Sequence, residues 1–140
     1  MTSILFLALG LSMAPPSIRS FPTSPSELSK AIKDDDKRFR RYAARTLKAD
    51  IKRALSETTS NDAVTQLEAR QVLGDYEMFV VPACITQIET YDVGPSCVTI
   101  LGLLEAGSAF EALEQAQENS TLSRRHQKKI KRAIEILDGQ

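Results

Sequence analysis

Apolar residues recur every three or four positions along most of the chain from Ser24 onward, which is the spacing that predicts amphipathic helices. The clearest case lies in residues 37–55, where Phe39, Ala43, Leu47 and Ile51 share one stripe and basic residues occupy the other faces. β-branched runs are short, aromatic residues are few, and no segment requires a strand. The pattern therefore predicts an all-α fold.

Capping residues and glycines divide this pattern into expected helices. Ser24 before Pro25, with Glu27 three residues after the cap, starts the first helix, and the acidic run 34–36 caps the second over 37–55. A third helix is expected over 61–73, closed by Gly74. The remaining helices are expected over 76–90, 93–104, 108–118 and 122–138.

The chain also shows weak internal similarity with a period close to 30 residues. Residues 51–55 align with 81–85 at a shift of 30, and residues 81–85 align with 110–114 at a shift of 29. A fixed period of this length with two short helices per unit is typical of an α-solenoid, in which each hairpin buries its apolar face against the next. An irregular helical bundle is the alternative.

Three stretches resemble a known family of repeats. CVTILGLLEAGSAFEAL (97–113), LGDYEMFVVPACI (73–85) and ELSKAIKDDDKRFRRYAARTL (27–47) are similar to the short HEAT-like repeats of the phycobilisome-lyase type. Residues 91–98 depart from the family pattern because they lack its usual Arg pair. The resemblance implies a right-handed α-solenoid of about three HEAT-like helical hairpins plus capping helices, and a protein-binding groove lined by residues 61–73, 93–104 and 122–137.

The first 24 residues differ in composition from the rest. An apolar run over residues 4–11 is followed by Ser12-Met13-Ala14, a small-x-small cleavage pattern, and then by a stretch rich in Pro and Ser. This composition predicts a signal peptide and linker over 1–24, a repeat domain over 25–140, and export to the periplasm or the exterior. A docked N-terminal helix in a cytoplasmic protein is the alternative. The run is too short for a transmembrane anchor.

Charge is unevenly distributed although the formal net charge is zero. Fourteen of the eighteen basic residues lie in 37–53 and 124–132, whereas residues 54–119 carry eleven acids and one base. If the two basic helices lie at opposite ends of a solenoid, an acidic centre separates them, which favours a protein partner of complementary charge or self-association end to end. The alternatives are simple solvated helix faces, and anion or nucleic-acid binding through the two basic helices. The candidate surface residues are Arg40, Arg41, Arg45, Arg124, Arg125, Lys128 and Arg132.

Cys84 and Cys97 fall on consecutive expected helices, at similar distances from the turn that joins them. In an exported protein they could form a disulfide, and otherwise they are expected to be two buried thiols.

The sequence offers little catalytic chemistry. His126 is the only histidine, lies among basic residues and is expected at the surface, so no Cys/His metal site can form. No phosphate-binding loop or nucleophile motif is present. We therefore expect no catalytic residue, no metal and no cofactor, and a non-catalytic protein-binding or scaffold module, with a lyase-like enzyme as a further alternative.

Overall fold

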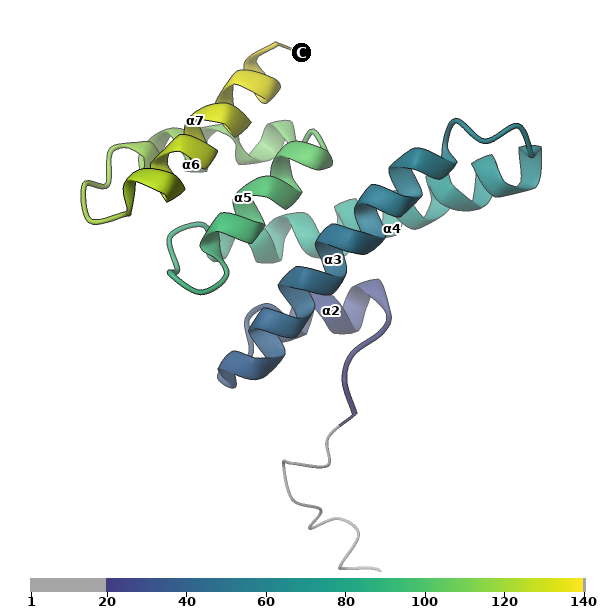
Figure 1. Ribbon diagram of the computed structural model, residues 1–140, viewed down its shortest axis with the longest axis horizontal. Coiled ribbons are helices and arrows are strands. Elements are labelled where there is room, and N and C mark those ends of the chain that lie inside the picture. Colours follow the sequence, from purple (N-terminus) through teal and green to yellow (C-terminus); the bar gives the residue numbers. More distant parts are fainter. Residues whose placement is uncertain (1–19, 140) are drawn as a thin grey trace, which may run out of the picture.

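The structure, a computed structural model, describes residues 20–139 and is all-helical over that range (Figure 1). This confirms the predicted all-α class. Its helices are α2 (Pro25–Ala31), α3 (Lys37–Glu57), α4 (Ala63–Thr86), α5 (Gly94–Leu103), the short 3-10 helix η2 (Gly107–Ala109), α6 (Phe110–Gln117) and α7 (Arg124–Asp138).

Side-chain caps fix where four of these helices begin. The Ser24 hydroxyl accepts a hydrogen bond from the Glu27 N–H at 3.2 Å, and the Glu27 carboxylate accepts one from the Ser24 N–H in return. Asp36 caps α3, Asp62 caps α4 and Ser123 caps α7. Such caps satisfy amide groups that have no partner within the helix, and the sequence-based starts of α2, α3 and α4 are confirmed.

The expected break at Gly74 is wrong, because α4 runs without interruption for 24 residues. Gly74 lies within this helix, and no atom would lie within 4 Å of a Cβ built on it. Pro82 is also inside the helix and on its exposed side, where the carbonyl group that loses its amide partner can bond to water. Ala69 is buried before Gly74, and Tyr76, Val80 and Cys84 are buried after it, so both halves pack as one helix.

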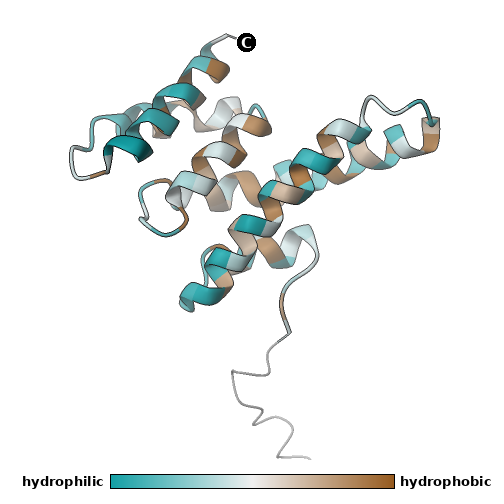
Figure 2. Cartoon of the chain, viewed as in Figure 1, coloured by the Kyte–Doolittle hydropathy of each residue, from teal (hydrophilic) through white to brown (hydrophobic). Residues whose placement is uncertain are grey.

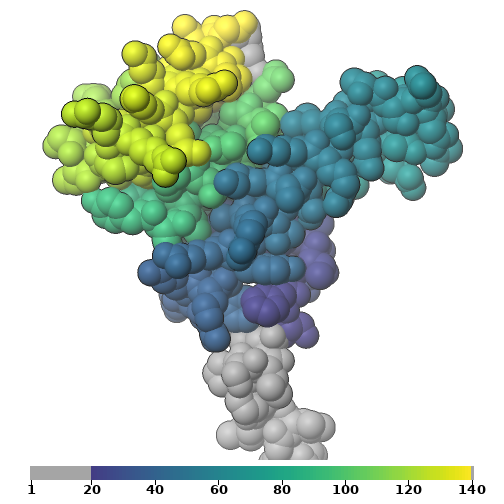
Figure 3. Space-filling model, in the orientation of Figure 1, coloured from purple at the N-terminus to yellow at the C-terminus, as the bar shows by residue number. Residues whose placement is uncertain are grey.

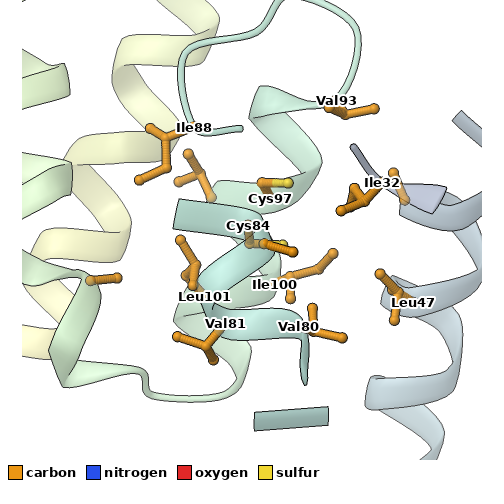
Figure 4. Packing of buried hydrophobic residues seen from close by; sticks show 14 of the residues in the cluster. Ile32, Leu47, Val80, Val81, Cys84, Ile88, Val93, Cys97, Ile100 and Leu101 are labelled. Carbon is orange, nitrogen blue, oxygen red and sulfur yellow. The ribbon is translucent and has the colours of Figure 1, made fainter. Parts of the chain in front are cut away.

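The described helices pack against one another as one body. α2 contacts α3 and α4, α4 contacts α3 and α5, and α7 contacts α5 and α6. α5 also packs on α3, so that α3, α5 and α7 lie side by side with α5 in the middle (Figure 1). One apolar core lies between these three helices and the other helices, and it includes Leu47, Val80, Ile100 and Leu101 (Figure 4).

The loop between α4 and α5, residues 87–93, touches helix pairs on both sides. Arg40 of α3 binds Asp92 with 2.9 Å from Nε to Oδ2. The Tyr91 hydroxyl donates to the Thr121 carbonyl at 2.8 Å, and the Asn119 amide donates to the Glu89 carboxylate at 3.1 Å. This loop therefore joins the first helix pair to the segment that leads into α7.

The residues just before α2 pack on the helical body. The Phe21 ring lies 5.2 Å from the Phe39 ring and 4.7 Å from the Tyr42 ring, centroid to centroid, and Pro22 is buried. The apolar run and cleavage pattern lie outside the described residues, and the signal peptide stays a prediction. None of the described helices is long and apolar enough to cross a bilayer.

Candidate functional site: a basic groove over α5

A shallow groove of about 390 Å³ runs between α5 and α7. Its floor is mostly apolar, and two basic side chains of α7 stand at its edge. The lining residues are Val98, Thr99, Gly102 and Leu103 from α5, and Lys129, Arg132, Ala133 and Ile136 from α7. These two helices belong to the segments 93–104 and 122–137 that the repeat resemblance implied as a contact surface, whereas the third implied segment, 61–73, does not line this groove.

Basic side chains lie on both helices that flank α5, which are α3 and α7. On α7, Arg125, Lys129 and Arg132 are spaced by four and three residues, which places them on one helix face. On α3, the same spacing aligns Arg41, Arg45, Lys48 and Lys52. α5 has no charged residue, and it appears white to brown between two helices with teal segments (Figure 2).

The two basic rows are close enough to influence each other. The pKa of Lys48 is lowered by partial burial and then by the positive charges of Lys129 and Lys52. Because Lys129 belongs to α7 and Lys48 to α3, their charges interact across α5. The expectation of two separated basic patches with an acidic centre is therefore wrong: an uncharged helix lies between them.

On α4 and α6, acidic residues outnumber basic ones. α4 carries exposed Glu68, Asp75 and Glu77, and α6 carries exposed Glu111 and Glu114. Arg70 is the one basic residue on these two helices. The zero net charge thus conceals two basic helices, α3 and α7, and two acidic helices, α4 and α6.

The seven candidate surface residues do not act as one patch. Arg132 lines the groove, and the exposed Arg41, Arg45 and Arg125 lie in the two basic rows. Arg124 and Lys128 are exposed on α7 but do not line the groove. The sequence-based selection omitted Lys48 and Lys129, which helical spacing from Arg41 and Arg125 could have identified.

Arg40 has an internal role. Its Nη2 lies 2.9 Å from Oδ2 of Asp92, and both side chains are mostly buried. Its Nη1 donates to the carbonyl oxygens of Asp34 at 2.7 Å and Asp35 at 3.0 Å. With its donors directed to these groups, Arg40 ties the α2–α3 turn to the α4–α5 loop.

The two cysteines meet in the core, as their spacing suggested (Figure 4). Both are buried and are free thiols in the structure. The hydrogen bond between the two thiols and burial raise the pKa of the Cys84 thiol well above its usual value, so it stays protonated and weakly nucleophilic at neutral pH. A disulfide between them stays a prediction for an oxidising compartment.

His126 is buried, with 2% of its surface exposed, and the expectation of a surface histidine is wrong. Its ring packs on Gly94, where an added Cβ would lie 2.8 Å from Cε1 and 2.5 Å from the Ile88 carbonyl oxygen. Nε2 has no hydrogen-bond partner among the described residues. Burial lowers the pKa of His126, opposed by the Ile88 carbonyl and the Glu89 charge and assisted by Lys129.

Within residues 20–139, no group of three or more His, Cys, Asp or Glu side chains is placed to hold a metal ion. The groove is lined by apolar, hydroxyl and basic groups, a chemistry suited to holding an anionic segment with apolar side chains. Comparison with protein-family models, with characterised proteins and with solved structures finds no match for this chain.

Proposed function

We propose that this protein is a non-catalytic protein-binding module built from three helical hairpins, α2–α3, α4–α5 and α6–α7, stacked as a short right-handed HEAT-like solenoid. Supporting this arrangement, α3, α5 and α7 pack in sequence along one layer, and each hairpin contacts the next. Short solenoids of this kind present an extended surface on one layer, which here is the layer that holds the groove.

The groove is the observation that carries the proposal. Its apolar floor, with Val98, Leu103 and Ile136, favours apolar side chains, and its edges carry Lys129 and Arg132. Lys48 adds a positive charge from the α3 side. The matching ligand is an acidic segment of a partner protein, bound as an amphipathic helix with its apolar face down and its carboxylates toward the basic rows.

Nucleic-acid or other anion binding through residues 37–53 and 124–132 is the second candidate, because the two basic rows share one face. The groove lining contains no aromatic side chain on which a base could stack. The apolar side chains of the groove floor also make no favourable polar contact with a phosphate backbone. An acidic protein segment therefore fits the lining better.

The test measures binding of a fluorescent acidic amphipathic peptide by anisotropy. Reversing both rim charges, Lys129→Glu with Arg132→Glu, should weaken binding by about 10-fold or more, because two attractions become repulsions. Lys128→Glu with Lys131→Glu is the matched control: the charge change and the helix are the same, but neither residue lines the groove. This control should retain most of the affinity.

Two results would contradict the proposal. Equal losses in both double variants would show that only the overall charge of α7 matters. Tighter binding of single-stranded nucleic acid than of the peptide, with an affinity that falls steeply with salt, would favour the second candidate instead.

A further inference from the structure

α4 exposes a second surface of uncommon character. Its inner side is apolar and buried, yet its outer side is also rich in apolar residues. Soluble helices usually carry polar residues on the side away from the core, so an apolar outer stripe indicates contact with another surface. The exposed large apolar residues of this stripe are Val64 (63% exposed), Leu67 (57%), Val72 (38%), Met78 (62%) and Phe79 (39%).

The same stripe is acidic. Glu68 and Asp75 are exposed and seven residues apart, which places them on one side of α4, roughly a quarter turn from Leu67 and Met78. The first half of α4 also belongs to an arm, formed with the end of α3, that projects from the body (Figure 3). α4 thus presents an acidic, amphipathic helix face in an accessible position, the chemistry that complements the basic groove.

We propose that the groove of one molecule binds the outer face of α4 from a second copy of this chain. This inference rests on the proposed function and names its partner. Leu67 and Met78 would lie on the apolar floor, while Glu68 and Asp75, roughly a quarter turn around α4, would face the basic rows that include Lys129 and Arg132. The groove and α4 are different surfaces, so the contact is head-to-tail, and each complex keeps one free groove and one free α4 face.

The first measurement is sedimentation velocity of the full chain over a range of micromolar concentrations. We expect the average mass to rise with concentration, and the association to weaken by about 10-fold or more between low salt and about 500 mM salt, because the basic and acidic side chains are exposed. Two single variants, Leu67→Glu on α4 and Arg132→Glu in the groove, should each abolish the rise in average mass with concentration. Both residues are exposed, so both variants should fold.

Mixing the two variants gives the sharper result. The Leu67→Glu molecule keeps an intact groove, and the Arg132→Glu molecule keeps an intact α4 face. A head-to-tail contact therefore predicts a 1:1 complex in the mixture that cannot grow further. Lys128→Glu, which changes the charge of α7 outside the groove, should associate like the original chain.

Three outcomes would overturn the inference. One is a full chain that stays monomeric at all concentrations in low salt. Another is a symmetric contact, in which Leu67→Glu blocks association but Arg132→Glu does not. The third is a monomeric chain that associates only after residues 1–19 are removed, which would assign the outer face of α4 to that segment. Peptide binding by the Leu67→Glu variant tests the groove separately, so each proposal can fail without the other.

Discussion

His126 packs its ring on the backbone of Gly94, where any larger residue would collide with it. Its burial has a signal in the sequence, because His126, Ile130, Ala133 and Leu137 follow one another at spacings of four, three and four, and all four are buried. The surrounding Arg and Lys residues conceal this stripe when composition alone is considered. The helical spacing therefore predicts that His126 is buried, whereas the basic residues beside it in the sequence wrongly indicate a surface position.

The burial of His126 should make stability depend on pH. Its pKa is lowered in the folded protein, so the unfolded chain takes up a proton first as the pH falls. The contribution of neutral His126 is fully present above the ordinary histidine pKa of about 6.5 and is lost as the pH falls through the lowered value. Thermal melts from pH 7.5 to pH 5 should show a falling Tm.

Other groups should not mimic this effect. Glu27 and Asp62 have lowered pKa values, and they act below this pH window. In His126→Leu, which has a similar volume and no proton to gain, the fall in Tm over this window should largely disappear. An unchanged pH dependence in that variant would assign the effect to another group.

Arg40 differs from its neighbours in the same basic run because its donors are used inside the protein. Arg40→Ala removes the partner of the mostly buried Asp92 and should lower the free energy of unfolding by about 2 to 4 kcal/mol. The exposed Arg45 makes no comparable contact with the residues that the structure describes, so Arg45→Ala should change the free energy of unfolding by no more than about 0.5 kcal/mol. Urea denaturation of the two variants compares them directly, and equal losses would contradict the assigned role of Arg40.

Among the elements, the starts of α2, α3 and α4 could be predicted because caps are local features. The continuity of α4 through Gly74 could not be predicted from such local features. Glycine in a helix costs only about 1 kcal/mol relative to alanine, and burial of Ala69 before it and of Tyr76 and Val80 after it outweighs that cost. A turn residue therefore marks a helix end only where tertiary packing does not favour continuation.

Two glycines that look alike in the sequence should respond in opposite ways to the same change. Gly74→Ala should stabilise the protein by about 0.5 to 1 kcal/mol, because a Cβ there meets no atom and alanine favours the helix. Gly94→Ala should destabilise it by about 1 to 3 kcal/mol, because the Cβ would collide with a backbone carbonyl and the His126 ring. Calorimetric melts distinguish the signs, and a destabilising Gly74→Ala would contradict a continuous α4.

For the whole molecule, the sequence locates the two basic helices but not their relation in space. That relation depends on α5 packing between α3 and α7, a contact between residues far apart in the chain. The apolar floor was equally hard to predict, because Leu103 and Ile136 resemble core residues until the packing shows them at the surface. Basic and acidic stretches alternate along the chain. In the fold, basic residues predominate on α3 and α7, whereas acidic residues predominate on α4 and α6.

The α4–α5 loop has a consequence for how the chain unfolds. Stacked helical hairpins can in principle melt one at a time, since each contacts only its neighbours. Here Asp92 is bound by the first hairpin and Tyr91 by the segment entering the last helix, so loss of either end removes support from the same seven residues. The described part of the chain should therefore fold and melt as a single cooperative unit, with residues 87–93 as its link.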